Sequence, residues 1–492
     1  MKTNPRILEI NTRVWIKRFG KSTTLASIPD EQIIEWSNNG FDYIWLMGIW
    51  KINTKIISEY CFEPELVSSY NSTLKDWHTK DVIGSPYSID CYEVNPLLGT
   101  KEDLIKLKDK LNSKGIKLIL DFVCNHFSAK SSLIWSNKEI FLPADEFLFR
   151  NDPYTFYKSP VNDNEFLAHG RDPLFPPWKD TAQVNFYNQN ARKFLTDTLI
   201  DLTTICDGVR CDMAMLPLNN IFYNTWIGVI KKYGFERPEK EFWEEAIPAV
   251  KQKRDDFIFI AETYWDLEWL LQNLGFDFTY DKRLTDRLAS ADVRSIRDHL
   301  RAEEAYQKKS VRFLENHDED RAIVKLGKEK SIAAAVVIST IQGMIFYFDG
   351  QCDGKKIKLP IQLGREPIEK QDERIKNFYK TIFEITKADI FRRGKWTLLE
   401  PIPVSDNDDT SENILCWIWE LNKEIRIVAV NYANKTSRCR LKFTINNASD
   451  NIVLFDEINK VEYSRSYKEI TEKGLYIELK AFNSHIFSVT LP

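Results

Sequence analysis

Eight stretches of the chain are apolar without alternating polar positions. They lie at residues 7–15, 43–47, 116–123, 207–213, 257–261, 276–280, 312–314 and 344–348. A strand that is covered on both faces has this continuous pattern. Between most of these stretches, apolar residues recur at helical spacing, as at residues 101–114, which Gly115 follows as a stop, and at residues 190–204. Eight buried strands alternating with helices predict an α/β fold, a (β/α)8 barrel with insertions, over roughly 390 residues.

Two regions depart from the barrel pattern. Residues 127–179 lack sustained periodicity and are rich in aromatic residues, so we expect an excursion after strand three that overhangs the barrel mouth, with His169 as a possible ligand contact. Residues 394–492 contain short alternating runs separated by Asn, Asp and Gly, which indicate an all-β sandwich. The expected domains are therefore a barrel at residues 1–126 and 180–393, the excursion at residues 127–179, and a C-terminal β-sandwich at residues 394–492.

Composition and charge exclude several kinds of partner. The net charge of −4 provides no basic field for a nucleic acid, and no run of about 20 apolar residues predicts a membrane segment. The first residues, MKTNPRILEINTRVW, lack a basic stretch followed by an apolar one, so no secretory signal is predicted. The eight cysteines form no CxxC pair and several lie in apolar stretches, which favours reduced thiols and a cytoplasmic location. The oligomeric state stays open.

Polar side chains stand at the ends of four of the apolar stretches. The segments are DFVCNH at residues 121–126, GVRCD at 208–212, FIAET at 259–263 and FLENHD at 313–318. In a (β/α)8 barrel, the C-terminal ends of the strands meet at the rim where the active site is built. We therefore expect Asp212, Glu262 and Asp318 to lie together. Because side chains alternate along a strand, Arg210 and Asp212 should both point into the barrel mouth.

Three carboxyl groups in one site suit the cleavage of a glycosidic bond with retention. That reaction needs a carboxylate nucleophile and a protonated carboxylic acid about 5 to 5.5 Å apart. Arg210 should lower the pKa of Asp212 and keep it ionised as the nucleophile. Glu262 follows a wholly apolar run, and desolvation should raise its pKa and keep it protonated as the acid. Further groups are expected to bind the sugar: Asp318, His126 and His317.

The four segments resemble the four signature regions of the α-amylase family, glycoside hydrolase family 13, in the order in which that family has them. The resemblance extends to GSPYSIDCYEVNPLLGT at residues 84–100, DTAQVNF at 180–186 and GMIFYFDGQ at 343–351. It implies that Asp212 is the nucleophile, Glu262 the general acid and base, and Asp318 the transition-state carboxylate. The sugar-binding residues that it implies are Tyr87, His126, Arg210 and His317.

The chain departs from the family pattern after the nucleophile and after strand eight. Many members of the family carry polar residues at the third and fourth positions after the nucleophile, whereas this chain has Met215 and Leu216. The subsite for the leaving group should therefore be less polar or differently built. The Gly-Gln-Glu that the family has after strand eight is Gly-Gln-Cys here, ending at Cys352.

A third departure concerns calcium, which often joins the barrel to the excursion in this family. The resemblance matches Asn125 to one ligand of that ion, but Gln183 stands where a ligating Asp is usual. Calcium prefers charged oxygens, so the loss of a carboxylate weakens the site. We expect no required cofactor, and a structural calcium at Asn125 is disfavoured but left open.

The leading functional hypothesis is a retaining α-glycosidase that acts on α-glucan or maltooligosaccharide. The alternative is an enzyme of the same mechanism in which a sugar or phosphate replaces water: an α-glucan transglycosylase, a trehalose-forming isomerase or a sugar phosphorylase. A remote alternative is a non-catalytic scaffold protein of the family, although the retention of all three carboxylates argues against it. The exact substrate, the linkage, and endo or exo action are not determined by the sequence.

Overall fold

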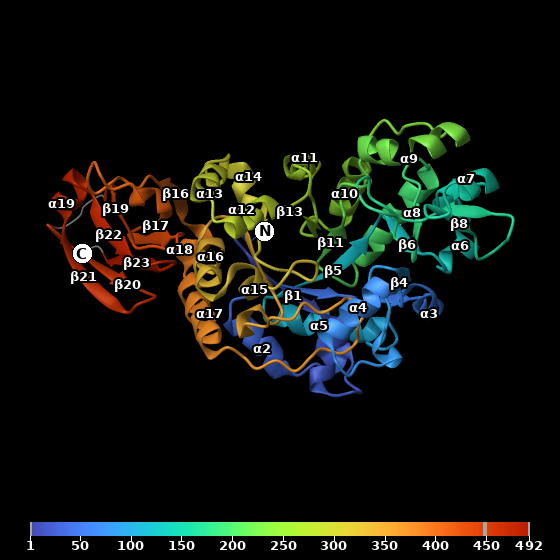
Figure 1. Cartoon of the computed structure of the whole chain (residues 1–492), viewed down its shortest axis with the longest axis horizontal. Helices are drawn as coiled ribbons and strands as arrows, with labels where there is room; N and C mark the ends of the chain where they lie inside the picture. The colour runs from blue at the N-terminus through green and yellow to red at the C-terminus, as the bar shows by residue number, and fades with distance from the viewer. Residues whose placement is uncertain (1, 446–449, 491–492) are drawn as a thin grey trace.

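A computed structural model describes residues 2–445 and 450–490 of the chain. Its centre is a closed barrel of eight parallel strands in the order β1-β15-β14-β13-β12-β11-β5-β2 (Figure 1). These strands are β1 (Arg6–Asn11), β2 (Tyr43–Met47), β5 (Lys117–Val123), β11 (Gly208–Asp212), β12 (Ile258–Ala261), β13 (Phe278–Tyr280), β14 (Ser310–Arg312) and β15 (Met344–Phe348). The predicted (β/α)8 fold is confirmed.

Two strands, β1 and β14, differ most in extent from the predicted ones. The apolar stretch at residues 7–15 is divided, because β1 ends at Asn11 and the short helix α1 (Thr12–Trp15) completes the stretch. The stretch predicted at residues 312–314 begins at the last residue of β14. The start of this strand was not predicted, because Ser310 and Arg312 are polar residues that the strand buries. A pattern of apolar residues cannot reveal a strand whose buried side chains are polar.

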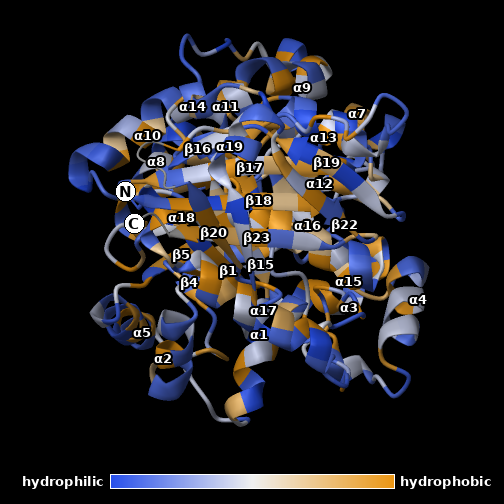
Figure 2. Cartoon of the chain, turned by 90° about the vertical axis from the view of Figure 1, so that its left-hand side faces the viewer, coloured by the Kyte–Doolittle hydropathy of each residue, from blue (hydrophilic) through white to orange (hydrophobic). Residues whose placement is uncertain are grey.

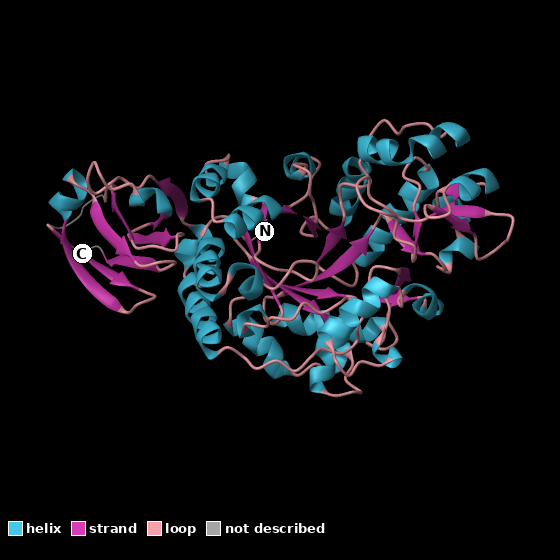
Figure 3. Cartoon of the chain, in the orientation of Figure 1, coloured by secondary structure: helices cyan, strands magenta, loops and turns pink. Residues whose placement is uncertain are grey.

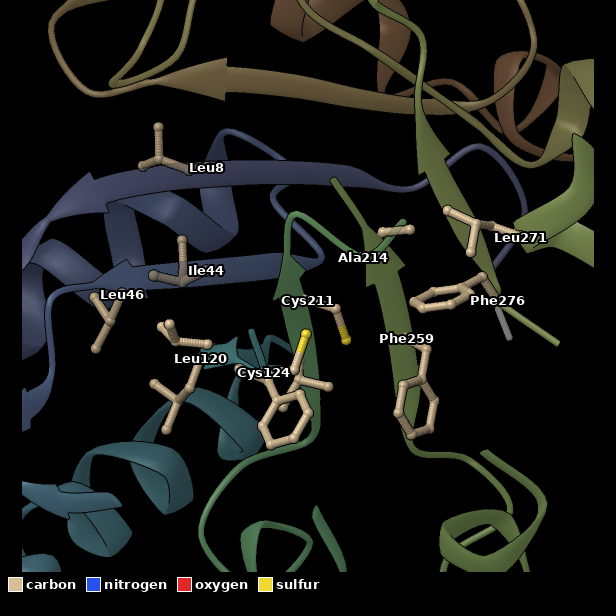
Figure 4. Close-up of a cluster of buried hydrophobic side chains, with 14 of the residues drawn as sticks. Leu8, Ile44, Leu46, Leu120, Cys124, Cys211, Ala214, Phe259, Leu271 and Phe276 are labelled. Carbon is tan, nitrogen blue, oxygen red and sulfur yellow. The ribbon is translucent and has the colours of Figure 1, made fainter. Parts of the chain in front are cut away.

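The alternation of side chains along the barrel strands separates two apolar layers. Trp45 and Ile258 belong to a cluster that fills the barrel interior. Leu8, Ile44 and Phe259 belong to a second cluster between the strands and the surrounding helices (Figure 4). Because both faces of the strands are buried, the strands read as continuous apolar runs.

The helices surround the barrel. The Thr100 hydroxyl accepts from the Asp103 N–H and the Asp103 carboxylate accepts from the Thr100 N–H, a capping box that begins α5 (Lys101–Ser113), and Gly115 follows its end with a φ of 74°. The other helices are α2 (Asp30–Asn38), α8 (Gln189–Leu202), α9 (Asn219–Tyr233), α10 (Phe242–Lys253), α11 (Glu268–Asn273), α12 (Lys282–Ser290), α13 (Val293–Leu300), α14 (Glu304–Lys308), α15 (Ala322–Leu326), α16 (Lys328–Thr340), α17 (Glu373–Thr386) and α18 (Asp389–Arg393). None of the helices in the described part of the chain is both long and apolar enough to span a bilayer.

Two insertions stand at the C-terminal rim of the barrel. The first, between β2 and β5, contains β3 (Trp50–Ile52), α3 (Ile57–Tyr60), α4 (Pro64–Thr73) and β4 (Ile89–Val94). The second is the excursion, whose base is closed by the antiparallel pair of β6 (His126–Ser128) and β10 (Thr181–Gln183). Instead of irregular chain it contains α6 (Leu133–Ser136), α7 (Glu146–Asn151) and a sheet of β7 (Pro143–Ala144), β9 (Phe166–Ala168) and β8 (Phe156–Lys158), to the right in Figure 1.

The C-terminal domain is an antiparallel β structure beside the barrel (Figure 3). Its larger sheet is β16 (Lys395–Leu399), β17 (Ile414–Leu421), β18 (Glu424–Asn431), β23 (Ser484–Thr490), β20 (Asn451–Asp456) and β21 (Val461–Ser466), and its smaller sheet is β19 (Ser437–Leu441) with β22 (Leu475–Leu479). A short helix, α19 (Tyr467–Glu472), precedes β22. Hydrophobic residues run along β18 and β20 (Figure 2), and both sheets contribute to one hydrophobic core. Residues 446–449 and 491–492 of the predicted domain lie outside the described residues.

Candidate active site

The rim of the barrel brings the sequence-predicted carboxyl groups to one place. Asp212 is the last residue of β11, and Glu262 directly follows the last residue of the neighbouring β12. Asp318 lies six residues after β14. The parallel register of the strands therefore places side chains from distant parts of the sequence around one opening.

Arg210 links two of these carboxyl groups. One terminal nitrogen of its guanidinium lies 2.7 Å from Asp212 Oδ1, and the other lies 2.7 Å from Glu262 Oε2. The first nitrogen also lies 3.3 Å from Asp121 Oδ1. The guanidinium is buried and lies against the interior ring of Trp45, with its central carbon 5.0 Å from the ring centre. Arg210 and Asp212 thus face the barrel interior together, as the alternation along β11 predicts.

Glu262 is held in place on both of its carboxyl oxygens. The Met213 N–H donates to Oε2 at 2.7 Å, and the Tyr264 hydroxyl donates to Oε1 at 2.9 Å. Burial raises the pKa of Glu262 to about 7; the Arg210 charge opposes that rise, and the carboxylate of Asp212 adds to it. The direction is the one expected from the apolar run before Glu262, and it leaves a substantial protonated fraction near neutral pH.

Asp212 behaves differently from the expectation. Burial raises its pKa, although the charge and hydrogen bond of Arg210 act in the opposite direction. Arg210 therefore acts in the predicted direction, but the net shift of the Asp212 pKa is upward, because the sequence shows the neighbouring cation and not the depth at which the carboxyl group lies. Met213, the next residue, has a left-handed φ of 43°, which turns the chain sharply after the nucleophile position.

His317 connects Asp318 to the barrel wall. Its Nε2 lies 3.0 Å from Asp318 Oδ2 and 2.9 Å from the Tyr87 hydroxyl, and its Nδ1 hydrogen-bonds to Glu9. Burial opposes the charged imidazolium, but Asp318 and Glu9 outweigh it and raise the pKa of His317 well above its usual value. Burial likewise opposes ionisation of Asp318, yet His317 lowers the pKa of this half-exposed carboxyl to about 2. A charged Asp318 therefore faces the opening.

The aromatic and imidazole side chains form the wall next to these carboxyls. The Tyr87 ring stacks on His317 at 5.2 Å, and Arg210 lies 5.5 Å from the Tyr87 ring centre. His126 is buried beside Trp178, with ring centres 5.1 Å apart, and burial lowers its pKa to about 4, so it is neutral. His169 is buried in the excursion, where its ring stacks on a tyrosine and bonds to the Thr181 carbonyl. These contacts of His169 stabilise the excursion.

Three residues of this site were missed by reasoning from the sequence: Glu9, Asp121 and Tyr264. Glu9 and Asp121 are charged residues inside the apolar strands β1 and β5, and both are buried. A charge in such a strand needs a partner, which is a signal that could have found them. Tyr264 carries no comparable signal, since its contact with Glu262 depends on the turn after β12.

A cavity of about 550 Å³ opens at Glu262 and Asp318. Its lining also includes Met213, Tyr264, Trp265, Phe175, Trp178, Asp172, Glu268, Lys282, Arg283 and Asp286. Met215 and Leu216, which were expected to shape the subsite for the leaving group, are buried in the core instead. Charged residues of α12 line this side of the cavity, and Met213 is the apolar residue after Asp212 that reaches it.

The residues at the expected calcium position do not fit a cation. The amide nitrogen of Gln183 lies 2.9 Å from Asn125 Oδ1, 3.0 Å from the Asn125 carbonyl and 3.0 Å from the Val184 carbonyl. Three oxygens thus converge on an NH2 group that can donate two hydrogen bonds. Gln183 is fully buried, and its amide fills the space between the base of the excursion and the barrel.

Comparison with known proteins relates this geometry to a family. The family model described as "Alpha amylase, catalytic domain" matches residues 84–398, more than half of the chain. The alpha-amylase MalA of Haloarcula japonica is 23% identical over 360 residues, which cover 70% of this chain and 47% of MalA, so the chain spans about half the length of that relative. Alpha-amylase 3 of Dictyoglomus thermophilum is 24% identical over 423 residues, covering 79% of this chain and 77% of the relative.

Among solved structures, the maltogenic alpha-amylase AmyB of Thermotoga neapolitana has the same fold. It superposes with a TM-score of 0.69 over 99% of both chains, at 20% identity. The shared fold and the family match over residues 84–398, together with Asp212, Glu262 and Asp318 at one rim, lead to one assignment. The chain belongs to the α-amylase family of glycoside hydrolases.

Proposed function

We propose that this protein is a retaining α-glycoside hydrolase that cleaves α-glucan or maltooligosaccharide through a covalent glycosyl-Asp212 intermediate. The observation that supports this most directly is the shared contact of Arg210 with Asp212 and Glu262, 2.7 Å on each side. A common guanidinium keeps the two carboxyl groups on one face of the opening, as a retaining pair separated by roughly 5 to 5.5 Å requires.

The reaction has two steps. Asp212 attacks the anomeric carbon while Glu262 gives its proton to the glycosidic oxygen, so the carbon–oxygen bond breaks and the leaving sugar departs as an alcohol. Glu262, now a carboxylate, takes a proton from water, and the water oxygen attacks the anomeric carbon and releases Asp212. The pKa of Glu262, about 7, suits a group that is acid in one step and base in the next.

The groups around Tyr87 would bind the sugar that becomes attached to Asp212. A tyrosine ring offers a stacking surface for a sugar, while Asp318 and the charged His317 offer hydrogen bonds to its hydroxyls. The positive charge of His317 is retained by Glu9 behind it.

Transglycosylation, isomerisation to trehalose and phosphorolysis remain the alternative, since they use the same first step. Chromatography of the products from maltoheptaose, with and without phosphate, distinguishes them. Only shorter sugars should form if water is the acceptor, whereas longer sugars, phosphorylated sugars or an isomer of unchanged length would reject hydrolysis. Asp212→Asn should abolish the reaction, and a variant as active as the wild type would favour the non-catalytic scaffold.

We also propose a cytoplasmic protein that requires no calcium and has no nucleic-acid or membrane partner. All eight cysteines are free thiols in the structure, and six of them are buried. The Gln183 amide supplies the contacts that a cation would otherwise make at Asn125.

A further inference from the structure

The loop between β15 and α17 crosses the rim of the barrel and joins the insertion after β2. We call residues 358–365 the strap. At one end of the strap the Lys358 amine donates to the Asp318 carbonyl, and at the other the Arg365 guanidinium pairs with Asp76 and Asp81 at 3.2 and 3.0 Å. The strap therefore spans from the backbone of Asp318, a proposed catalytic residue, to the insertion after β2.

A small, separate hydrophobic core anchors the strap. Leu363 is fully buried together with Tyr70, Leu74 and Val82, and Leu359 packs against the same group. This cluster is distinct from the barrel core and from the core of the C-terminal domain. Leucines of the strap thus share an interior with α4 and the chain that follows it.

Backbone hydrogen bonds also join the strap to residues 81–83. Val82 and Leu363 form an antiparallel bridge, the Ile83 N–H donates to the Gln362 carbonyl at 2.8 Å, and the Gly364 N–H donates to the Asp81 carbonyl at 2.7 Å. Packing, backbone hydrogen bonds and ion pairs therefore all hold the strap against the insertion after β2. We call the strap and the insertion residues that it contacts the wall.

Arg13 links the strap to the segment that leads to Tyr87. One nitrogen of the buried Arg13 donates to the Gly84 carbonyl at 3.0 Å and to the Ile361 carbonyl at 2.6 Å. Ile361 packs against the barrel-interior cluster, as does Tyr87. The strap and Tyr87 therefore contact the same cluster, and Lys358 ties the strap to Asp318 in the same site.

An open cavity lies at Glu262. In the proposed reaction Glu262 faces the leaving oxygen, and the cavity of about 550 Å³ is lined by Glu262, Tyr264 and Trp265 from the turn after β12. No strap residue lines this cavity. A chain of sugars can therefore continue through this opening from the leaving side.

We propose that the strap makes the enzyme exo-acting, so that it removes single α-glucosyl units from the non-reducing ends of maltooligosaccharides. The inference rests on the proposed function, because it assigns Glu262 to the leaving side and Tyr87 to the attached sugar. In an α-glucan the sugars beyond the attached one lie towards the non-reducing end, and the strap, tied to Asp318 and packed on the cluster that Tyr87 also contacts, is proposed to block that direction.

Two maltoheptaosides test the proposal, one with a free non-reducing end and one blocked there by a 4,6-O-ethylidene group, with the products separated by chromatography. From the free substrate, glucose and the hexaoside should appear first. The blocked substrate should be cleaved at least about 100-fold more slowly, since a wall at that end excludes it. Internal fragments at similar rates from both substrates would overturn exo action. Failure to cleave either one, or maltose, would instead reject the proposed hydrolase.

A shortened strap tests the structural cause. Lys355 pairs with Glu366 at 2.6 Å, and Glu369 accepts from the Lys356 N–H at 2.7 Å, so the ends of the loop lie close together. Replacing residues 359–365 by three glycines should preserve cleavage of a 4-nitrophenyl α-glucoside and raise the blocked-to-free rate ratio at least about tenfold. Shortening the excursion loop at residues 161–164 to two glycines is the control and should leave the ratio unchanged. A shortened strap that folds, cleaves the free substrate and still excludes the blocked one would refute the role of the strap.

Discussion

Gln183→Asp should make the contact between the excursion and the barrel, which we propose to be calcium-independent, depend on calcium. In the wild type the Gln183 amide nitrogen lies within 3.0 Å of Asn125 Oδ1, the Asn125 carbonyl and the Val184 carbonyl. The substitution removes this donor and places a carboxylate beside the same oxygens. Without a cation, Asn125 Oδ1 and the Val184 carbonyl lose this donor, while the Asn125 carbonyl keeps the Val184 N–H, and a negative charge is buried beside them.

The size of the effect follows from the lost hydrogen bonds. An amide donates two hydrogen bonds, and each buried oxygen left without a partner costs about 1–3 kcal/mol, so the free energy of unfolding should fall by about 2–6 kcal/mol. For a domain as large as this barrel, this lowers Tm by roughly 3–8 °C. A carboxylate with three neighbouring oxygens supplies most of the roughly six to eight oxygens that calcium takes, with water as the remainder, and calcium at 100 times its Kd should restore about 2.7 kcal/mol.

Thermal unfolding with calcium chloride or with EDTA measures this directly. The wild type should unfold at the same temperature in both, whereas Gln183→Asp should be less stable in EDTA and regain stability with calcium. Gln183→Ala is the matched control, because it loses the same donor without adding a ligand and should gain nothing from calcium. A wild-type Tm that falls in EDTA would refute the reasoning, as would a Gln183→Asp protein that ignores calcium.

Two further predictions concern Glu262. Glu262→Gln should lose far more activity on substrates with poor leaving groups than on activated aryl glycosides, because the proton matters most when the leaving oxygen is basic; equal losses in kcat/KM on both would contradict the assigned role. The first step needs protonated Glu262, whose pKa is about 7, so its rate should fall as pH rises through about 7, when this proton is lost. A pre-steady-state profile that is level from pH 6 to 9 would show that another group supplies the proton.

The pattern of apolar residues predicted the barrel because its strands are buried on both faces. That signal does not distinguish the end of a strand from a buried helix, which is why β1 was extended through α1 (Thr12–Trp15), whose residues are also buried. The apolar pattern gives no prediction for the excursion, because its strands of two or three residues are too short to show a period.

The site was predicted only in part. Asp212, Glu262 and Asp318 stand at strand ends, where the topology of a barrel directs side chains to one opening. Glu9 contributes through His317, more than 300 positions away along the chain. Such a contact becomes visible only when β1 and the segment after β14 are placed around the same barrel.

The sequence alone determined the barrel, the three carboxyl groups at its rim and the family to which they point, since these depend on local pattern and strand order. The tertiary structure decided the rest. It reversed the expected pKa shift of Asp212, because burial is a property of the whole fold and here exceeds the effect of a neighbouring cation. It also brought the strap and α4 into one small core and packed the strap on the cluster that Tyr87 also contacts, since a wall between distant segments arises only from packing.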